Sequence, residues 1–363
     1  MRKICTAFLF LMISAGVTQG QEADFGVYSN FTFVPGSKLL FYDDFGKDAV
    51  GDFPAQWETG GSGEIVTTNQ NEGRWLSLQR RSGYLPTTKT ELPENYTIEF
   101  DLITNGYGTP NSASSKLFLA FLPKKAYSMG QAGSVADVEL LFSKMFTVNN
   151  VENFGSEAEV RIANRIQRTL EKPSNNVTHI SIAVNKKRLR VWFDQEKLVD
   201  SPNLLQGKLG KYFLIEARDI LPEKNQFAGI SNFRIAESTE DLRSQLNYNG
   251  KFSTTGIYFE TGSSKVKKES HGILKDIASL LTENPDIKLN IVGHTDSQGD
   301  DASNQQLSED RAKSVKNIFV AEFGLTAERF EPTGKGETEP VEDNSTETGR
   351  ANNRRVEFIR LSK

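Results

Sequence analysis

The hydrophobic pattern changes once along this chain, and the change constrains the fold more than any other feature. Before about residue 237, alternating apolar and polar runs such as Thr97–Leu102, Ile180–Val184 and Leu189–Phe193 are separated by Gly, Pro and Asn clusters. Such runs are typical of strands in a two-sheet β-sandwich. After about residue 253, apolar residues recur at helical spacing between strand-like runs. The sequence therefore predicts an all-β domain followed by an α/β domain.

The second domain is expected to follow the order β-α-β-α-β-β. Its expected elements are a strand around 257–259, a helix over 273–281 that Pro285 ends, a strand over 287–293, a helix over 307–323, and strands around 330 and 356–359. Both helices would then pack on one face of a mixed sheet.

Domain boundaries follow from the same pattern. We expect a signal peptide over 1–20, a β-sandwich over 21–237, a polar linker over 238–252 and the α/β domain over 253–363. Within the sandwich, the highly charged segment 156–170 is expected to form either a helix or a decorated loop.

The N-terminus has the three parts of a secretory signal peptide. A basic start at residues 1–3 precedes the apolar run Ile4–Val17, and small residues follow before Gln21, where cleavage is expected. The only cysteine, Cys5, precedes most of the apolar run, whereas a lipid-anchored cysteine would follow it. The mature chain is therefore expected to carry no thiol, no disulfide and no lipid anchor.

The composition argues against several partners and cofactors. The formal net charge is −4, whereas nucleic-acid binding needs a basic field. No stretch after residue 20 is long and apolar enough to form a transmembrane helix. His294 has no second histidine near it and His271 falls on an expected helix, so we expect neither a metal ion nor another cofactor.

Three polar motifs occur in order in the second domain. They are residues 293–299 (GHTDSQG), residues 304–312 (NQQLSEDRA) and residues 349–357 (GRANNRRVE). At these residues the sequence resembles the OmpA-like C-terminal domain, which also occurs in peptidoglycan-associated lipoprotein and in flagellar motor stators. The resemblance covers about residues 253–363, and the spacings between the three motifs match those of the family.

The resemblance implies binding of the peptidoglycan stem peptide, chiefly its diaminopimelate residue. In that family the aspartate of the first motif meets the ammonium group of the ligand, and the arginine of the second motif meets its carboxylate. Carried over by position, the implied ligand-binding residues are Asp296, Arg311, Asn304, Thr295, Gly299 and Arg354.

Elementary chemistry agrees with this assignment. Diaminopimelate ends in one ammonium and one carboxylate, so its receptor needs an anion beside a cation. Asp296 follows an expected strand and Arg311 lies near the start of the next expected helix, so a loop can bring them together. Gly299 permits a turn whose N–H groups face an anion. Taken alone, Asp296 would be a turn or cap residue, Arg311 a solvated charge, and Arg354 and Arg355 opposite-facing strand residues.

A second resemblance lies in the first domain, in the runs Leu39–Phe45, Lys187–Leu198 and Gly229–Ile235. Over about residues 38–237 the sequence is similar to the concanavalin-A-like or laminin-G-like jelly roll. The resemblance implies a lectin-like domain that binds a glycan or an envelope protein, although a fold alone does not define a ligand.

Two alternatives stay open for the first domain. Some jelly-roll glycosidases carry an E-x-D-x-x-E strand, and Glu99 and Asp101 match its first two positions, but Thr104 stands at the third. A wall-anchored glycan-processing enzyme is therefore one alternative, and exposed acids on a sandwich strand are the simpler account. The other alternative is an outer-membrane barrel joined to a periplasmic anchor, which needs about eight alternating strands with an apolar lipid face.

The sequence as a whole favours a non-catalytic cell-envelope protein. Its second domain would bind peptidoglycan, and its sandwich would present a binding face to a glycan or an envelope protein. The expected location is the periplasm, reached through the cleaved signal peptide, with attachment to the outer membrane left open.

Overall fold

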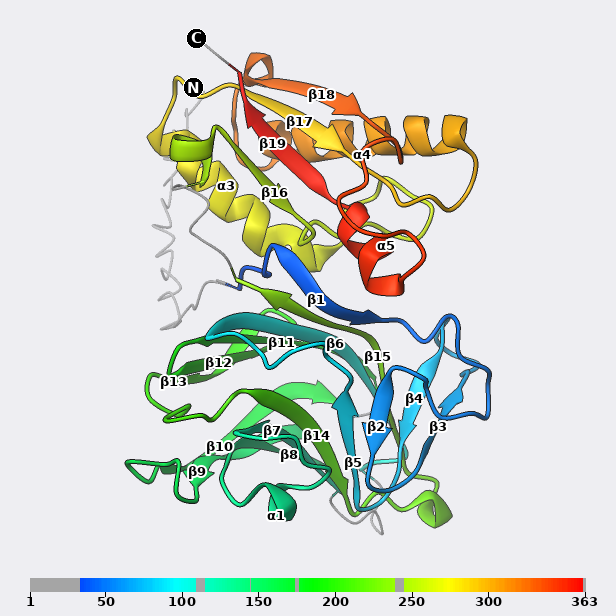
Figure 1. Ribbon diagram of the computed structural model, residues 1–363, viewed down its shortest axis with the longest axis vertical. Coiled ribbons are helices and arrows are strands. Elements are labelled where there is room, and N and C mark those ends of the chain that lie inside the picture. Colours follow the sequence, from blue (N-terminus) through cyan, green and yellow to red (C-terminus); the bar gives the residue numbers. More distant parts are fainter. Residues whose placement is uncertain (1–32, 109–114, 144, 174–175, 239–244, 362–363) are drawn as a thin grey trace, which may run out of the picture. The chain divides into compact units, whose positions relative to one another are not determined.

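The structure is a computed structural model that describes residues 33–108, 115–143, 145–173, 176–238 and 245–361. Three β-sheets form the framework of these residues, as Figure 1 shows. The expected signal peptide, residues 1–20, lies outside the described part of the chain.

The N-terminal region contains two sheets whose described strand pairs are all antiparallel. The eight-stranded sheet has the order β13 (Glu196–Ser201), β12 (Arg188–Phe193), β11 (Val177–Asn185), β6 (Asn95–Asn105), β15 (Phe227–Glu237), β4 (Trp75–Leu78) and β3 (Gly63–Val66), with β1 (Lys38–Asp43) paired to β15. The seven-stranded sheet has the order β10 (Ala163–Pro173), β9 (Met145–Phe154), β8 (Val135–Phe142), β7 (Ser115–Leu122), β14 (Tyr212–Arg218), β5 (Ser82–Pro86) and β2 (Trp57–Thr59). The short elements α1 (Met129–Ala132) and η1 (Pro222–Lys224) connect strands.

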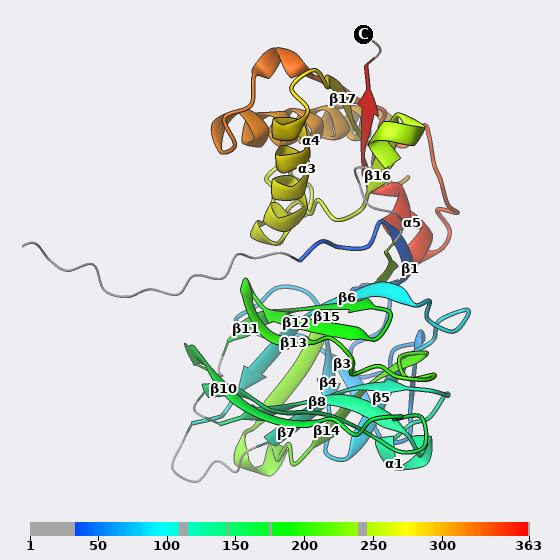
Figure 2. The ribbon, with the colours of Figure 1, turned by 90° about the vertical axis from the view of Figure 1, so that its left-hand side faces the viewer.

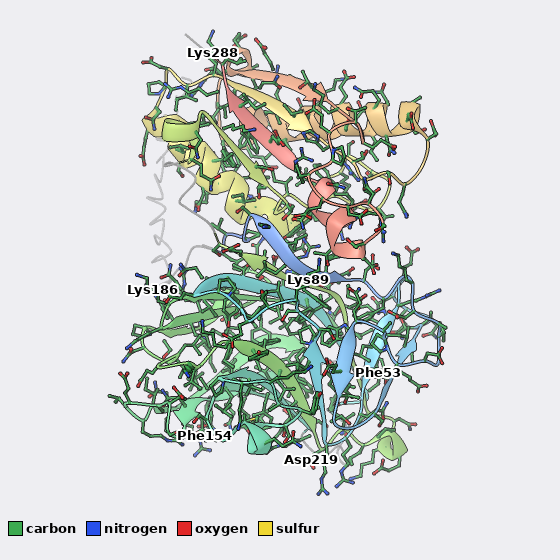
Figure 3. The ribbon with its side chains drawn as sticks, in the orientation of Figure 1. Phe53, Lys89, Phe154, Lys186, Asp219 and Lys288 are labelled. Carbon is green, nitrogen blue, oxygen red and sulfur yellow. The ribbon has the colours of Figure 1, made fainter. Side chains whose placement is uncertain are left out.

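The core between these two sheets is built from alternate residues of their strands. On β6, Ile98, Phe100 and Leu102 belong to the same buried cluster as residues of the other sheet, and side chains fill the space between the layers (Figure 3). Phe233 of β15 stacks with Phe100 and with Phe213 of β14, at ring-centroid distances of 5.7 and 6.1 Å. The predicted all-β character of this region is confirmed, and the jelly-roll assignment stays a prediction.

The charged segment 156–170 was expected to be a helix or a loop, and this expectation was wrong for its second half. Residues from Ala163 onward form β10, which pairs with β9 at the edge of the seven-stranded sheet. An edge strand can keep charged side chains in solvent on both faces, so it lacks the apolar alternation that reveals an interior strand.

The C-terminal region contains a four-stranded sheet with the order β16 (Lys251–Thr254), β19 (Val356–Arg360), β17 (Leu289–Gly293) and β18 (Phe330–Gly334). Only the β17–β18 pair is parallel. Helices α3 (His271–Glu283) and α4 (Asp301–Ala321) lie on one face of this sheet, as Figure 2 shows. The remaining elements are α5 (Glu347–Asn353) and the short turns η2 (Gln245–Asn249), η3 (Lys268–Ser270) and η4 (Ala327–Arg329).

Two features of the expected β-α-β-α-β-β order were wrong. The first strand is Lys251–Thr254, whereas Phe259 makes only an isolated bridge to Val266. An additional helix, α5, separates β18 from β19, because the side chain of Thr346 caps it by accepting from the N–H of Gly349. The observed order is therefore β-α-β-α-β-α-β.

The second helix of this domain starts earlier than expected. It begins at Asp301 because the Asp300 side chain accepts a hydrogen bond from the N–H of Ser303, as a helix cap does. No helix among the described residues is both long and apolar enough to cross a membrane.

Asp137 on β8 is a buried carboxyl group in the sandwich. Its exposed fraction is 0%, and neither carboxylate oxygen has a hydrogen-bond partner among the described residues. Burial, reinforced by Glu152 and Glu139, raises the pKa of Asp137 to about 8, although Arg218 and Arg161 oppose the shift. The group is therefore held mainly in its neutral form at pH 7.

This burial makes the stability of the sandwich fall as the pH rises from about 4 to about 8. The folded-state pKa of Asp137 is raised, so its favourable contribution is complete below about pH 4 and declines as pH rises toward 8. The substitution Asp137→Asn removes this ionisable group. The free energy of unfolding of the variant minus that of the wild type should therefore be larger at pH 9 than at pH 5, by on the order of 2–5 kcal/mol. The measurement is urea unfolding followed by tryptophan fluorescence, since Trp57, Trp75 and Trp192 all lie in the sandwich.

Asp52→Asn is the matched control for this prediction, because Asp52 is exposed. An equal effect of Asp137→Asn at both pH values would contradict the assignment of a neutral buried carboxyl group.

Candidate functional site

The first sequence motif forms the loop that leaves β17. Two backbone hydrogen bonds fix the start of the loop. The N–H of His294 donates to the carbonyl of Arg355 at 3.0 Å, and the N–H of Thr295 donates to the carbonyl of Gly336 at 2.9 Å. A side chain on Gly293 would place its Cβ 2.1 Å from the backbone oxygen of Ser308 on α4. Glycine is therefore required where helix and strand approach, and the approach fixes the direction in which the loop departs.

Asp296 lies three residues beyond β17 with only 8% of its surface exposed. One carboxylate oxygen accepts the N–H of Gln298 at 3.1 Å, and the other meets Nη1 of Arg354 at 2.5 Å. The structure therefore brings Asp296 and Arg354, two residues predicted for the site, into a direct ion pair.

Asn304 closes the same loop from the first turns of α4. Its side-chain amide donates to the carbonyl of Gln298 at 3.0 Å, to Glu337 at 2.6 Å and, more weakly, to the carbonyl of Asp296 at 3.4 Å. Gly299 lies within the loop at φ +102°, a backbone conformation that favours glycine. Asn304 and Gly299 thus determine the conformation of the loop, and neither contributes a charged group to the site.

Arg311 lies in the middle of α4, not near its start as the sequence suggested. Its Nε donates to the carbonyl of Ser263 at 3.1 Å, and its guanidinium lies 4.9 Å from the ring centroid of Phe259. Burial and the nearby Arg354 lower the pKa of Arg311 to about 10, although Asp296 opposes the shift. The group remains charged at neutral pH, but in a place where an additional anion would stabilise it.

Arg354 follows α5 and precedes β19, so the expected strand alternation with Arg355 was wrong. Its guanidinium reaches Asp296, while the buried Arg355 pairs with Glu357 at 2.7 Å. His294 is 2% exposed, and burial, then Arg355, lowers its pKa to about 4. His294 is therefore a neutral, buried residue at the strand end.

Thr295 occupies the start of the loop without a described side-chain contact to Asp296 or Arg311. Its hydroxyl is buried and has no hydrogen-bond partner among the described residues. Of the predicted site residues, Asp296 and Gly299 lie in the loop, and Asn304 of α4 and Arg354 after α5 are bonded to it. Arg311 is linked to them through electrostatic interactions with Asp296 and Arg354.

Sequence reasoning missed the contacts that hold the two arginines. Phe259 and Ser263 support Arg311, and the ring of Tyr42 lies 5.4 Å from the guanidinium carbon of Arg354. Tyr42 belongs to β1, more than 300 positions earlier in the chain, so no local signal connects it with Arg354.

Of the two acids considered for glycan hydrolysis, Glu99 is buried and Asp101 is partly exposed. Glu99 is 1% exposed and accepts the hydroxyl of Tyr258 at 2.7 Å, and His179 bridges Asp101 and Glu99 at 2.7 and 3.4 Å. Burial lowers the pKa of His179, but the hydrogen bonds and charges of Asp101 and Glu99 outweigh it and raise the pKa to about 10. The expectation of exposed acids was wrong for Glu99, and two carboxylates that are both held by His179 do not favour hydrolysis at this place.

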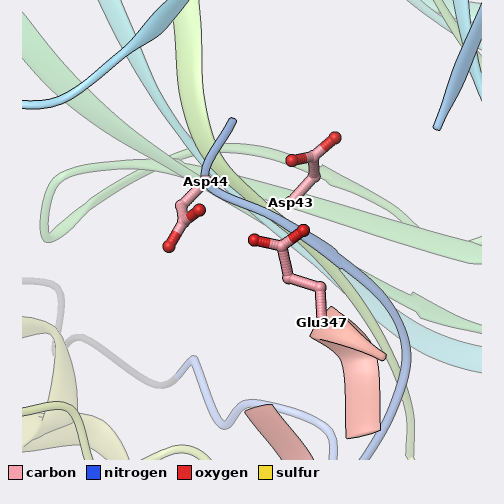
Figure 4. A group of neighbouring side chains, drawn as sticks. All are labelled: Asp43, Asp44 and Glu347. Atoms are coloured by element: carbon pink, nitrogen blue, oxygen red, sulfur yellow. The ribbon is translucent and has the colours of Figure 1, made fainter. Parts of the chain in front are cut away.

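An acidic cluster joins Asp43 and Asp44, the two residues that follow Tyr42, to Glu347 of α5 (Figure 4). One ligand atom from each residue lies within 4.8 Å of the others. The buried Asp43 already accepts from the indole of Trp57 at 3.0 Å, and burial raises its pKa to about 7. Burial and a hydrogen bond with Asp44 also raise the pKa of Glu347 to about 7. Protonation therefore relieves the repulsion in the cluster near neutral pH, and we assign no metal to it.

Comparison with known proteins identifies the C-terminal domain. Residues 258–354 match the model of the OmpA family, so this part of the chain is an OmpA-family domain. Over 101 residues the chain is 45% identical to outer membrane porin F of Pseudomonas aeruginosa, which covers 28% of this chain and 29% of the porin. Over 103 residues it is 40% identical to the outer-membrane lipoprotein YfiB of the same species, covering 28% of this chain and 61% of YfiB.

The chain thus spans less than two thirds of the length of either relative, and neither relative is named as an enzyme. Among solved structures, the peptidoglycan-associated lipoprotein of Burkholderia pseudomallei is 27% identical, with a TM-score of 0.28, over 30% of this chain and 89% of that chain.

The hydrogen bonds of Asn304 lead to a prediction about the loop. Asn304→Ala leaves the carbonyl of Gln298 and the Glu337 carboxylate without their donor, so the C-terminal domain should lose about 1–3 kcal/mol of stability. Calorimetric unfolding measures this loss, and hydrogen exchange should rise at the amides from Gln298 to Gly299. Gln306→Ala on the same helix is the control, because Gln306 is exposed and bonds only Asp310 among the described residues. Equal melting temperatures for both variants would show that Asn304 does not hold the loop.

Proposed function

We propose that the C-terminal domain binds the diaminopimelate stem peptide of peptidoglycan and that the protein is a non-catalytic component of the cell envelope. The observation that carries the proposal is the state of Arg311. Its guanidinium is half-buried beside the Asp296–Arg354 ion pair, and its terminal nitrogens have no hydrogen-bond partner among the described residues. A cation in this setting favours the binding of an anion.

The ligand chemistry complements these three charges. The ammonium group of diaminopimelate would take the place of Arg354 Nη1 at the Asp296 carboxylate, and the neighbouring carboxylate would bind the Arg311 guanidinium. Arginine suits that role because its planar fork can bond both carboxylate oxygens. Each charge-assisted hydrogen bond contributes about 1.5–3 kcal/mol net, so one stem peptide would be held with modest affinity. The polymeric wall offers many copies, which increases retention.

The domain organisation and location belong to the same proposal. The sandwich would span 21–237, the linker 238–252 and the wall-binding domain 253–363. The relatives named as outer-membrane proteins support a location in the periplasm, after cleavage of the signal peptide over residues 1–20.

The sandwich would present a separate binding face to a glycan or an envelope protein. A hollow of about 440 Å³ is a candidate place for such a ligand, and it is lined by Arg81, Gly83, Ser128, Glu216, Arg218 and Asp219. Its mixture of cationic, anionic and hydroxyl groups suits a polar ligand.

Isolated sacculi test the wall contact directly. In a pull-down with the purified mature protein, Asp296→Ala and Arg311→Ala should each reduce retention about 10- to 100-fold, because each removes one charge-assisted contact. Lys313→Ala is the control, since it removes a cation of the same helix whose side chain is 47% exposed and pairs with Glu309. Equal retention of all four proteins would place the wall contact elsewhere.

The two site charges also predict ligand selectivity. A stem peptide with lysine in place of diaminopimelate keeps the ammonium group and lacks the adjacent carboxylate. It should bind the wild type about 10-fold or more weakly, because Arg311 then stays without its anion. Calorimetric titration with the two soluble peptides measures the difference, and Arg311→Ala should bind both peptides about equally. Persistent discrimination by Arg311→Ala would show that another residue reads the carboxylate.

A further inference from the structure

Both arginines of the site are supported by contacts that lead back to the sandwich. Arg354 lies over the ring of Tyr42, a residue of β1. Arg311 is supported by Phe259 and Ser263, and this segment follows Tyr258, whose hydroxyl bonds Glu99 on β6. These contacts connect the two arginines of the proposed site to side chains that lie outside the OmpA-family domain.

Strand pairing fixes the position of Tyr42. The register of β1 with β15 pairs Tyr42 with Arg234, and the Arg234 guanidinium lies 5.3 Å from the Tyr42 ring centroid. The Arg354 guanidinium lies 5.4 Å from the same centroid. Only 8% of Tyr42 is exposed, and burial, together with the nearby Asp44, raises its pKa to about 12. The ring therefore stays a neutral phenol whose π-electrons attract both guanidinium groups.

Backbone contacts join β1 to the helix that carries Arg354. Leu39 donates its N–H to the side chain of Asn352 at 3.0 Å and accepts from the same amide at 3.1 Å. Tyr42 donates its N–H to the hydroxyl of Thr348 at 3.2 Å. Since α5 ends immediately before Arg354, these bonds fix the position of the Arg354 backbone. The Tyr42 ring contacts the guanidinium at the other end of the side chain.

The segment that contacts Arg311 is also held by residues of the sandwich. Arg234 lies 4.1 Å from the ring centroid of Tyr258, so the same arginine touches both tyrosines. Tyr258 in turn donates to Glu99, which also contacts His179 at 3.4 Å. A fixed Tyr258 restrains the segment that supports Arg311.

We propose that Tyr42 is a positioning residue of the peptidoglycan site, so that the sandwich contributes to recognition of the stem peptide. This inference rests on the function proposed above. When the ligand ammonium group displaces Arg354 from Asp296, the Tyr42 ring keeps the Arg354 guanidinium beside the ligand carboxylate. Without the ring, Arg354 must be ordered on binding, and affinity is lost.

The test uses the full mature chain and a soluble muropeptide with a diaminopimelate stem, titrated calorimetrically. Tyr42→Leu should weaken binding about 3- to 30-fold, and Tyr42→Phe should restore it to within about twofold, because only the ring is required. In a double-mutant cycle, Tyr42→Leu should cost little affinity once Arg354→Ala is present. A purely structural role of Tyr42 would leave its effect independent of Arg354.

Phe118→Leu is the matched control. Phe118 is also 8% exposed and lies 4.6 Å below an arginine, Arg218, but on the seven-stranded sheet. It should not change the affinity for the muropeptide.

Each outcome has a distinct meaning. Wild-type affinity in Tyr42→Leu, with binding lost in Arg311→Ala, would overturn the role of Tyr42 and leave the proposed function intact. Absence of binding by the wild type would overturn both. If Tyr42→Leu does not fold, Tyr258→Phe serves instead, since it keeps the ring over Arg234 and removes the bond to Glu99. It should weaken binding about 2- to 10-fold, and unchanged affinity would contradict the dependence on the sandwich.

Discussion

The pairing of β1 with β15 is the constraint on which most of this molecule depends. It places Leu39 and Tyr42 where helix α5 can bond to them, and it places Tyr42 beside Arg234. A shift of one residue would turn Tyr42 to the opposite face of the strand and remove the ring from both arginines. The register of one short strand therefore determines the surroundings of Arg354, and through Arg354 those of Asp296.

Elements with a strong local signal could be predicted from the sequence, and elements defined by distant contacts could not. Alternation located β6, β11 and β12, and helical spacing located α3 and α4, because these patterns reflect one buried face. The position of Asp296 after β17 followed from the same pattern. The residues Tyr42, Phe259 and Ser263 carry no such signal, since each matters only through an arginine that is distant in sequence.

The helix α5 shows why a motif can be recognised and its conformation still be wrong. Residues 349–357 resemble the family motif, but the sequence predicted only a strand over 356–359 with strand alternation at Arg354 and Arg355, and no helix before them. The Thr346 cap and the buried Asn352 and Asn353 instead favour a helical turn, because their amides satisfy backbone groups of neighbouring segments. Glu99 was misjudged for a related reason: alternation places it on the outer face of the sandwich, and only a contact from Tyr258 shows that this face is covered.

Buried charged groups favour one packing arrangement of this covered face over the alternatives. The imidazolium of His179 between Asp101 and Glu99, and Arg234 beside Tyr258, satisfy one another only in one arrangement of the strands. Networks of this kind add little net stability, but they penalise any alternative packing that leaves a charge unpaired.

The ion pair between Asp296 and Arg354 has a consequence for the kinetics of the proposed binding. A zwitterion carries no net charge, so its arrival exchanges partners among existing charges and releases almost no counterions. Long-range steering is then weak, and the association rate should change little with ionic strength. Attachment to the wall through such a site would stay nearly constant when the salt content of the surrounding medium rises or falls.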